Sequence, residues 1–488
     1  MPEPMTNKGR WLALIIVCLG YLMIVLDVTI VGVALPSIRE DLGFSETSLA
    51  WVVNAYLLTF GGFLLLGGRL GDLFGQRRLF LIGITFFTLA SLACGLANTQ
   101  GLLVAARALQ GFGGAVVSAV GLSLVMSLFT EQGERAKAMG VYGFVAAGGG
   151  TIGVLLGGLL TDKLNWHWIF LVNLPVGIAV FALCLVLVPA ARGQAAEGRL
   201  DVAGAISVTA ALMLAVYAIV NGNGTGWTSA QTLGLLGAAV VLLAVFVAIE
   251  ARVRAPLVPL GIFRLRNLTT ANGIGILSAA AMFAAFFFST LYLQLVLGYS
   301  PLQVGLAFLP QSLIMAACSL GLSARLVMRF GIKPPMITGL LLMTLALLLF
   351  ARAPVDGSFV TDLLPSMILL GLGAGIGFNP IFLAAMSDVP QEESGLASGV
   401  VNTAFMMGGA LGLAVLASLA ASRTDSLLAS GNGQLDALTG GYHVAFLVGA
   451  IFALGATVLG AALLRVRMQA PAQEGQQPGG ALAGAEAD

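Results

Sequence analysis

The sequence predicts an all-α polytopic membrane protein with fourteen transmembrane helices, arranged as two six-helix bundles plus two inserted central helices. Composition is the first observation behind this prediction, because 58% of the 488 residues are hydrophobic and only 9% are charged. A soluble protein carries about 25% charged residues. The mean hydropathy of +0.99 points the same way. The number of apolar runs and the distribution of basic residues are the other two observations.

Fourteen apolar runs, each long enough to cross a bilayer as a helix, follow one another along the chain. Most connections are short, the longest being expected at 254–267 and 423–442, and no loop has room for a folded domain. The tail 467–488, rich in Ala, Gly, Gln and Pro, is expected to be disordered. After an N-terminal segment 1–10, the expected spans are 11–35, 48–69, 79–97, 101–129, 136–161, 166–189, 201–221, 231–250, 268–297, 301–326, 335–353, 360–387, 396–422 and 443–466.

The basic residues predict the orientation of these spans. With the N-terminus in the cytoplasm, 18 of the 23 Lys and Arg residues fall in inner loops and tails. Only Arg39, Lys163, Arg352 and Arg423 fall outside, and Arg107 lies within a span. Basic residues concentrate on the cytoplasmic side of membrane proteins. The asymmetry supports both the helix count and cytoplasmic termini, because one missed span would reverse every later loop.

The two halves of the chain share a motif. Residues 68–77 read GRLGDLFGQR and residues 324–333 read ARLVMRFGIK, so that Arg-Leu, Phe-Gly and a final base align. The repeat divides the chain into bundles over 11–189 and 268–466, with two extra helices in the linker 190–267. Parallel repeats are typical of transporters that expose one site alternately to the two sides of a membrane.

Several classes of function are excluded by what the sequence lacks. The net charge of +1 gives no basis for binding nucleic acid. All four cysteines fall in apolar spans, where they are expected as small buried side chains, and the two histidines cannot build a metal site. Neither an ATP-binding Gly-Lys loop nor a Gly-x-Ser-x-Gly elbow occurs. The chain is therefore expected to be no enzyme and to need neither metal nor cofactor.

Asp27 is the residue on which the functional interpretation depends. It lies within the first span, where a carboxylate costs roughly 2.5–3.5 kcal/mol and marks a functional candidate. Arg107, in the fourth span, is a buried cation that needs a partner. Counted from the outer helix ends, Asp27 lies roughly 12 Å deep and Arg107 roughly 9 Å deep, so we expect them to pair, directly or through water. The alternative is that either residue is purely structural.

This pair is expected to tie a proton to a conformational change. A nearby arginine favours the ionised carboxylate, whereas separation from the arginine and burial favour the protonated acid. A movement that brings Asp27 and Arg107 together or apart would therefore release or bind a proton.

Two glycine-containing motifs accompany the pair. Gly68 and Gly75 permit a tight turn between the second and third spans, at the predicted cytoplasmic surface. The charged residues of this turn are Arg69, Asp72, Arg77 and Arg78. Within the fifth span, small residues on one face allow close contact with another helix. These residues are Gly149, Gly153, Gly157 and Gly158.

Over about residues 12–465, these motifs resemble the major facilitator superfamily, and specifically its fourteen-helix drug:proton antiporters. The resemblance rests on residues 26–36, 68–78 and 107–114 together with the helix 5 glycines. It implies a major facilitator fold and proton coupling through Asp27 and Arg107. It also implies that the 68–78 cluster latches the two bundles together and that the helix 5 glycines form the antiporter motif.

The sequence departs from the family pattern at a few positions. Gly32 stands where the family usually has Asn, Leu73 where it has a base and Gln76 where it has Arg. These last two changes predict a weaker latch. Val154 replaces the proline of the antiporter motif, which predicts a milder kink in the fifth helix.

Polar and aromatic side chains within the spans are candidates for a substrate cavity. Asp27 is the only acid clearly inside a span, and the second bundle is expected to carry acids only at its helix ends. A cavity of aromatic rings, amides and one carboxylate suits a bulky, amphipathic, neutral or monocationic molecule. The candidates are Asn54, Tyr56, Gln110, Phe287, Tyr292, Gln294, Gln311, Asn379 and Asn402.

The residues and the resemblance together predict proton-coupled efflux of hydrophobic or amphipathic drugs or antibiotics, by H+ antiport across a bacterial cytoplasmic membrane. The expected partners are a small amphipathic substrate, protons and the lipid bilayer, and the protein is expected to be a monomer driven by the proton gradient. Three alternatives stay open. They are a proton symporter or uniporter for a small metabolite, a dedicated exporter of one antibiotic, and a non-transporting sensor or intramembrane enzyme.

Overall fold

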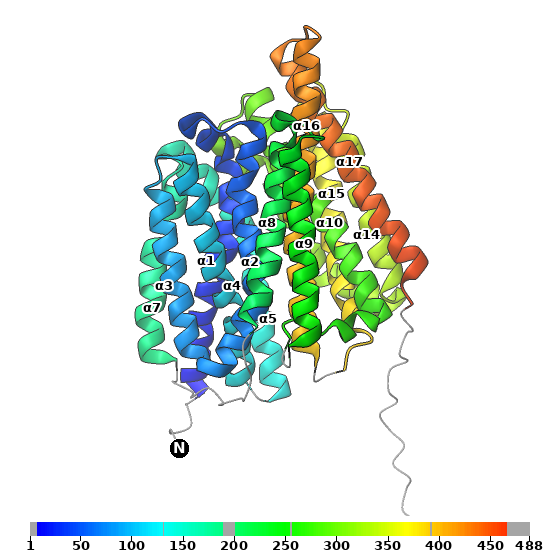
Figure 1. Cartoon of the computed structure of the whole chain (residues 1–488). Coiled ribbons are helices and arrows are strands. Elements are labelled where there is room, and N and C mark those ends of the chain that lie inside the picture. Colours follow the sequence, from blue (N-terminus) through cyan, green and yellow to red (C-terminus); the bar gives the residue numbers. More distant parts are fainter. Residues whose placement is uncertain (1–6, 130, 189–200, 254–255, 391–392, 466–488) are drawn as a thin grey trace, which may run out of the picture.

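The computed structural model describes residues 7–129, 131–188, 201–253, 256–390 and 393–465, which are helical apart from short connections (Figure 1). The first half and the linker contain α1 (Asn7–Leu42), α2 (Glu46–Phe74), α3 (Gln76–Gly95), α4 (Gln100–Leu128), α5 (Gln132–Lys163), α6 (Trp168–Leu171), α7 (Asn173–Leu187), α8 (Val202–Thr225) and α9 (Ala230–Arg252). The second half contains η1 (Leu260–Arg264), α10 (Arg266–Leu291), η2 (Tyr292–Val296), α11 (Pro301–Ala307), α12 (Leu309–Ala317), η3 (Cys318–Leu322), α13 (Ser323–Phe330), α14 (Lys333–Phe350), η4 (Phe359–Leu363), α15 (Leu364–Met386), α16 (Ser394–Ala429) and α17 (Gln434–Leu463).

These elements build the predicted membrane spans. Within the described residues, 13 helical stretches are long and apolar enough to cross a membrane. The 32-residue helix α5 occupies the place of the fourteenth. Four spans join more than one element, namely Trp168–Leu187, Arg266–Val296, Pro301–Phe330 and Phe359–Met386. The all-α polytopic membrane fold predicted from the sequence is confirmed.

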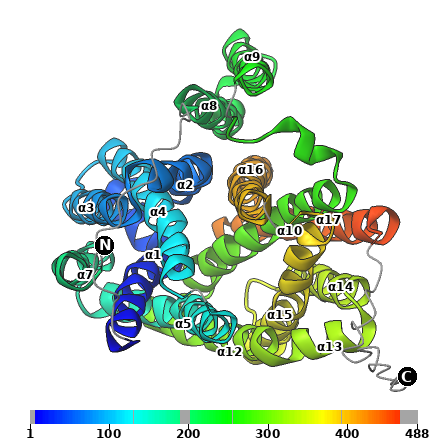
Figure 2. The ribbon, with the colours of Figure 1, turned by 90° about the horizontal axis from the view of Figure 1, so that it is seen from below.

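The helices pack as two groups with the inserted pair beside them. In the first group, α2 and α3 pack on α4, and α1 packs on α5 and α7. In the second group, α10 packs on α16 and α17, while α14 packs on α15 and α17. Helix α8 packs on both α2 and α16, and α9 packs on α8 at the edge of the molecule (Figure 2). Helix α8 therefore contacts both bundles.

The two bundles close against each other on the predicted outer side, which is opposite the start of α1 and the end of α17 (Figure 1). One apolar core there contains residues of both bundles, among them Ile38, Leu49, Phe288 and Phe446. A hydrogen bond of 2.7 Å also crosses the interface, from Nε2 of Gln294 to the carbonyl of Val33. Toward the other side, one core lies mostly in the first bundle and is joined by Ala410 and Ala414 of α16, and another core lies within the second bundle. The outer side of the protein is therefore shut in this conformation.

The expected long connection at 423–442 is wrong. Helix α16 continues to Ala429 and α17 begins at Gln434, so the two helices project as a hairpin beyond the neighbouring helix ends (Figure 1). Gly431 has φ +86°, and the amides of Gly431 and Asn432 donate to the carbonyls of Leu428 and Leu427. This glycine-based cap ends a helix with a tight turn. Hydropathy locates the apolar part of a helix and misses such a polar extension.

Two other expectations concern parts of the chain outside the described residues. They are the disordered tail 467–488 and the first part of the linker, at 189–200.

Candidate functional site

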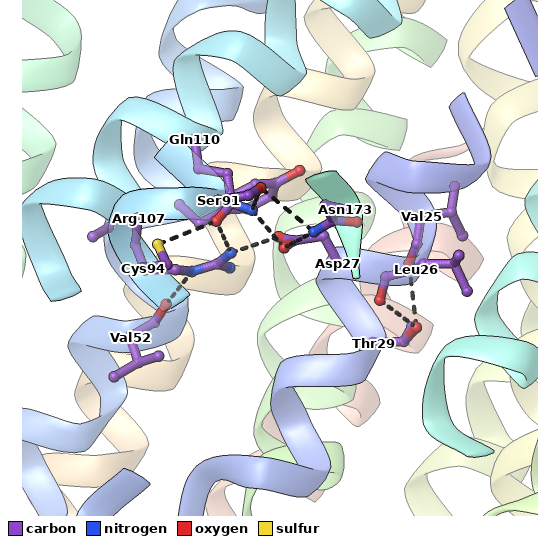
Figure 3. Close-up of polar contacts among 12 residues, drawn as sticks. Val25, Leu26, Asp27, Thr29, Val52, Ser91, Cys94, Arg107, Gln110 and Asn173 are labelled. Carbon is purple, nitrogen blue, oxygen red and sulfur yellow. Dashed lines mark hydrogen bonds and ion pairs between the residues drawn. The ribbon is translucent and has the colours of Figure 1, made fainter. Parts of the chain in front are cut away.

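Asp27 lies at the centre of a buried polar network in the first bundle (Figure 3). Its side chain in α1 is 0% exposed. Nη1 of Arg107 donates to Oδ2 of Asp27 at 2.5 Å, and Nε2 of Gln110 donates to Oδ1 at 2.6 Å. Nδ2 of Asn173, from the start of α7, approaches Oδ1 at 3.4 Å. Both carboxylate oxygens are therefore satisfied, and the predicted ion pair is direct.

Arg107 is held independently of the carboxylate. It is 2% exposed, its Nε donates to the carbonyl of Val52 at 2.9 Å, and its Nη1 also donates to Oε1 of Gln110 at 2.6 Å. The guanidinium lies over the rings of Tyr56 at 4.3 Å and Phe170 at 5.7 Å. A cation over an aromatic face is stabilised by the ring. Arg107 therefore has binding partners besides Asp27.

A second layer of contacts positions Gln110. Its Nε2 donates to Oγ of Ser91 at 2.8 Å, and Sγ of Cys94 lies 3.6 Å from its Oε1. Gln110 follows Arg107 by three residues, which places both on one face of α4. Ser91 and Asn173 were not singled out from the sequence, because their approach depends on helix rotation. The only available signal was an asparagine inside the apolar start of α7.

A cavity of about 560 Å³ lies between α2, α4 and α5 on one side and α16 on the other. It extends to the ends of α2 and α16 that lie on the predicted cytoplasmic side. Its wall combines aliphatic groups, two tyrosines, hydroxyls, an amide and one cation. The described residues of the wall are Tyr21, Phe60, Leu64, Leu65, Gly68, Arg69, Ser118, Ala119, Leu122, Ser123, Tyr142, Leu257, Leu396, Ser398, Gly399, Asn402 and Met406.

The proton-binding candidates lie beside this cavity rather than on its described wall. The rings of Tyr21 and Tyr142 stack at 4.2 Å and form part of the wall. Tyr21 precedes Asp27 by six residues, which is roughly 9 Å along α1. Because Asp27 and Arg107 are closed off from the cavity, this conformation offers them no direct contact with a molecule bound there.

Only one of the predicted cavity residues, Asn402, lies on the described wall. In the first bundle, Asn54 is buried with neither amide atom hydrogen-bonded, Tyr56 lies beneath Arg107, and Gln110 belongs to the Asp27 network.

The remaining candidates lie in the second bundle. Phe287 packs in the outer core, the hydroxyl of Tyr292 donates to the carbonyl of Pro354, and Gln294 bonds across the outer interface. Gln311 keeps an unpartnered Oε1, and Asn379 donates to Ser319 at 3.0 Å.

The junction of α2 and α3 contacts neighbouring segments at the predicted cytoplasmic side, and only Gly75 lies between the two helices. Gly75 forms the turn with φ +92°, a conformation that favours glycine. The guanidinium of Arg77 donates to the carbonyl of Leu185 in α7, and Arg78 is exposed. Gly68 and Arg69 line the cavity. The side chain of Asp72 lies outside the described part of the structure, so its predicted place in the latch stays a prediction.

Nη2 of Arg69 donates to the carbonyl of Pro256, in the connection between α9 and α10, at 3.3 Å. The end of α2 is thereby tied to the segment that follows the inserted helices.

The glycines of α5 are sites of close helix approach. A Cβ atom at Gly149 would lie 3.0 Å from Leu22 and Val25, and one at Gly157 would lie 2.7 Å from the carbonyl of Ile30. Gly153 meets α1 between them, against Leu26 and Thr29. These glycines therefore seat α5 on the part of α1 that carries Asp27, and α5 runs through Val154 as a single helix.

Gly158 makes a different contact, across the two bundles. A Cβ atom there would lie 2.6 Å from the carbonyl of Pro301 and 3.0 Å from Cα of Leu302, in α11. We expect Gly158→Leu to force α5 and α11 apart, which opens the outer side. Overpacking of this kind costs about 1–3 kcal/mol, enough to shift the population of the closed form by about 5- to 150-fold.

Cysteine labelling checks this shift. Val33→Cys, with the native cysteines replaced by serine, places a thiol in the closed outer core, where Val33 is 0% exposed. A membrane-impermeant maleimide should label it faster when Gly158→Leu is added. The matched control is Gly148→Leu, because a Cβ atom at Gly148 meets nothing within 4 Å. Equal labelling with both leucine variants would contradict the prediction.

A helical membrane bundle that is shut on one side, with a cavity reaching the other side and a buried ion pair next to it, has the arrangement of a membrane transporter. The sequence matches the Major Facilitator Superfamily profile over residues 17–413. The chain belongs to this superfamily.

Curated relatives match nearly the whole chain. It is 40% identical over 482 residues to the puromycin resistance protein pur8 of Streptomyces alboniger, covering 98% of this chain and 95% of the relative. It is 37% identical over 449 residues to the cephamycin export protein CmcT of Amycolatopsis lactamdurans, covering 92% of this chain and 91% of the relative.

Solved structures share the fold. A bacterial homologue of the human lysosomal transporter Spinster, in an inward-facing and unoccupied conformation, superposes with a TM-score of 0.65 at 15% identity. The match covers 93% of this chain and 97% of that chain.

Proposed function

We propose that this protein exports hydrophobic or amphipathic drug or antibiotic molecules across the cytoplasmic membrane of a bacterium in exchange for protons. The observation that carries the proposal is the fully buried Asp27–Arg107 pair next to a cavity that reaches one side of the membrane only. Relatives named for puromycin resistance and cephamycin export support the substrate class. The proton gradient supplies the energy, no cofactor takes part, and the protein works as a monomer.

The distribution of basic residues supports an orientation with both termini in the cytoplasm. The cavity then opens to the cytoplasm, and the conformation is the one that takes up substrate. Its wall of aromatic and aliphatic groups with a few hydroxyls and one amide suits a molecule with a large apolar body.

The chain's own residues suggest how a proton drives the exchange. In the cytoplasm-facing form, Arg107, Gln110 and Asn173 hold Asp27 as a carboxylate. A proton that reaches Asp27 from outside removes its charge and weakens its bond to Arg107, which keeps its contacts with Val52 and Gln110. Return to the cytoplasm-facing form restores the ion pair and expels the proton.

The glycine contacts of α5 form the surfaces along which α5 moves relative to α1 and α11. Gly149, Gly153 and Gly157 let α5 rest directly on α1, and Gly158 lets it meet α11 of the other bundle. Helix α5 thus borders both the Asp27–Arg107 pair and the contact that closes the outer side. A change in the charge of Asp27 can therefore be passed to that contact through α5.

The test is transport in vesicles with the purified protein reconstituted in a known orientation. With the cytoplasmic face outward and an acidic interior, we expect puromycin to accumulate inside while the internal pH rises. An inverted gradient should reverse the flux. Proton flow in the same direction as the substrate would establish a symporter instead, and flux that ignores the gradient would establish a uniporter.

A panel of substrates separates a broad exporter from a dedicated one. Puromycin and a lipophilic dye should both move if the apolar cavity wall determines selection. Movement of a single compound from a chemically varied panel would show a dedicated exporter and leave the proposal of antiport intact.

A further inference from the structure

Two buried carboxyl groups lie outside the Asp27 network, at the ends of the inserted helices. Asp201 immediately precedes α8, and Glu250 lies in the last turn of α9, on the predicted cytoplasmic side. Asp201 is only 4% exposed and Glu250 only 3% exposed. Helices α8 and α9 pack against each other, and the two side chains interact. The transport mechanism proposed above uses neither residue.

Each carboxyl group has one oxygen bonded and one oxygen bare. Oδ1 of Asp201 accepts from the amide of Gly204 at 2.7 Å, and Oε2 of Glu250 accepts from the amide of Val258 at 3.1 Å. Oδ2 of Asp201 and Oε1 of Glu250 are buried and accept no hydrogen bond. A buried polar atom without a partner is costly. One proton satisfies both atoms, because a protonated carboxyl donates and the other accepts.

Among the described side chains, no charged group of the neighbouring elements forms an ion pair with either carboxyl group. In α2, the guanidinium of Arg69 donates to the carbonyl of Pro256. In α9 itself, Arg252 is exposed. The ion pairs found among the described residues include neither Asp201 nor Glu250.

Helix α16 also packs on α8. Its charged side chains, Arg423 and Asp425, lie in its last two turns, at the predicted outer end and far from the pair. Ala205 and Leu257, near the pair in sequence or contact, belong to one small apolar core together with Leu66.

We propose that Asp201 and Glu250 form a second proton-binding site, which holds a single proton between the bare oxygens of the two carboxyl groups. The site does not depend on the identity of the transported molecule or on the role of Asp27. It lies at the cytoplasmic mouth of the cavity and is built by the inserted helices.

Proton occupancy of this site controls how tightly residues 256–258, which contribute Leu257 to the cavity wall, are packed. Glu250 holds the amide of Val258, Arg69 holds the carbonyl of Pro256, and Leu257 between them lines the cavity. Loss of the proton puts two negative charges side by side in an apolar setting, where like charges repel strongly. Residues 256–258 then separate from α8, and the wall at Leu257 loosens.

A carbodiimide that partitions into apolar regions tests for the proton, because it modifies protonated buried carboxyls and spares ionised ones. In full-length protein at pH 7, peptide mass spectrometry should find Glu250 or Asp201 modified and the exposed Glu40 unmodified. Modification should fall as the pH rises. Absence of modification at both residues from pH 5 to 8 would overturn the proposal.

Conservative variants show whether the proton is shared. Asn caps a helix as well as Asp, so Asp201→Asn keeps the start of α8 while its amide donates to an ionised Glu250. We therefore expect Asp201→Asn to abolish modification of Glu250, and Glu250→Gln to abolish that of Asp201. Unchanged modification of Glu250 in Asp201→Asn would show a residue protonated alone and would overturn the shared site.

Hydrogen exchange of peptides spanning 256–264 provides a second readout. After correction for the intrinsic rate, protection in the wild type should fall as the pH rises, whereas Glu250→Gln should keep it constant. Glu134→Gln is the matched control, since Glu134 is a half-buried acid paired with Arg10 on the same side. Loss of carbodiimide modification on addition of sodium at constant pH would show that sodium displaces the proton, and it would overturn a site that binds protons alone.

Discussion

Replacing Asp27 with asparagine is expected to abolish proton-driven transport while substrate binding from the cytoplasmic side persists. Asparagine has the same shape as aspartate but cannot bind or release a proton. The proton gradient can therefore no longer drive transport through this residue. Binding should survive because Asp27 is fully buried and absent from the described cavity wall. Transport into vesicles and dye binding to purified protein measure the two effects separately.

The variant also carries a stability cost that must be controlled. Asp27→Asn leaves Arg107 buried without its counter-ion, and breaking a buried pair from one side costs about 3–5 kcal/mol. Thermal unfolding and size-exclusion profiles should show a folded but weakened protein. Glu40→Gln, an exposed acid on the same helix, should match the wild type in every assay. Retained gradient-driven transport in folded Asp27→Asn would place proton coupling elsewhere.

Individual residues show how far sequence reasoning reached. The depth of Asp27 and of Arg107 in their spans follows from counting residues, and the structure places the two side chains in direct contact. The fourteen spans follow from hydropathy because a bilayer demands long apolar helices. Local sequence is sufficient for both.

The rotation of each helix about its axis and the polar extensions of helices cannot be predicted from hydropathy. Ser91 and Asn173 reach the Asp27 network only because α3 turns Ser91 toward Gln110 in α4 and α7 turns Asn173 toward Asp27 in α1. Gln294 and Phe287 carry the residue types of a cavity, yet they lie in the outer closure, since a transporter in one conformation buries part of its pathway. Asp201 and Glu250 come together only through the packing of α8 on α9.

Arg107→Gln is expected to have an effect on stability that depends on pH, unlike that of Asp27→Asn. Without Arg107, Asp27 can escape an unpaired buried charge by taking up a proton, whereas an arginine left alone stays charged. Arg107→Gln should therefore lose little stability at pH 5, where Asp27 is protonated. At pH 8 the loss should reach about 3–5 kcal/mol, because Asp27 must then either carry an unpaired buried charge or take up a proton from a solution in which protons are scarce. Asp27→Asn should be weakened similarly at both pH values.

Thermal unfolding of the two single variants and of the double variant at pH 5 and pH 8 checks this asymmetry. The double variant should be more stable than Asp27→Asn, because removing both charges leaves neither unpaired. Arg10→Gln, which breaks a half-exposed pair with Glu134, should cost no more than about 1 kcal/mol.

Equal losses for Arg107→Gln at both pH values would mean that Asp27 does not gain a proton when its partner leaves. The exchange of a proton for the Arg107 contact, on which the proposed antiport depends, would then have no basis in this pair. A pH-dependent loss confined to Arg107→Gln would show the reverse, since it requires that separating Arg107 from Asp27 drives proton uptake.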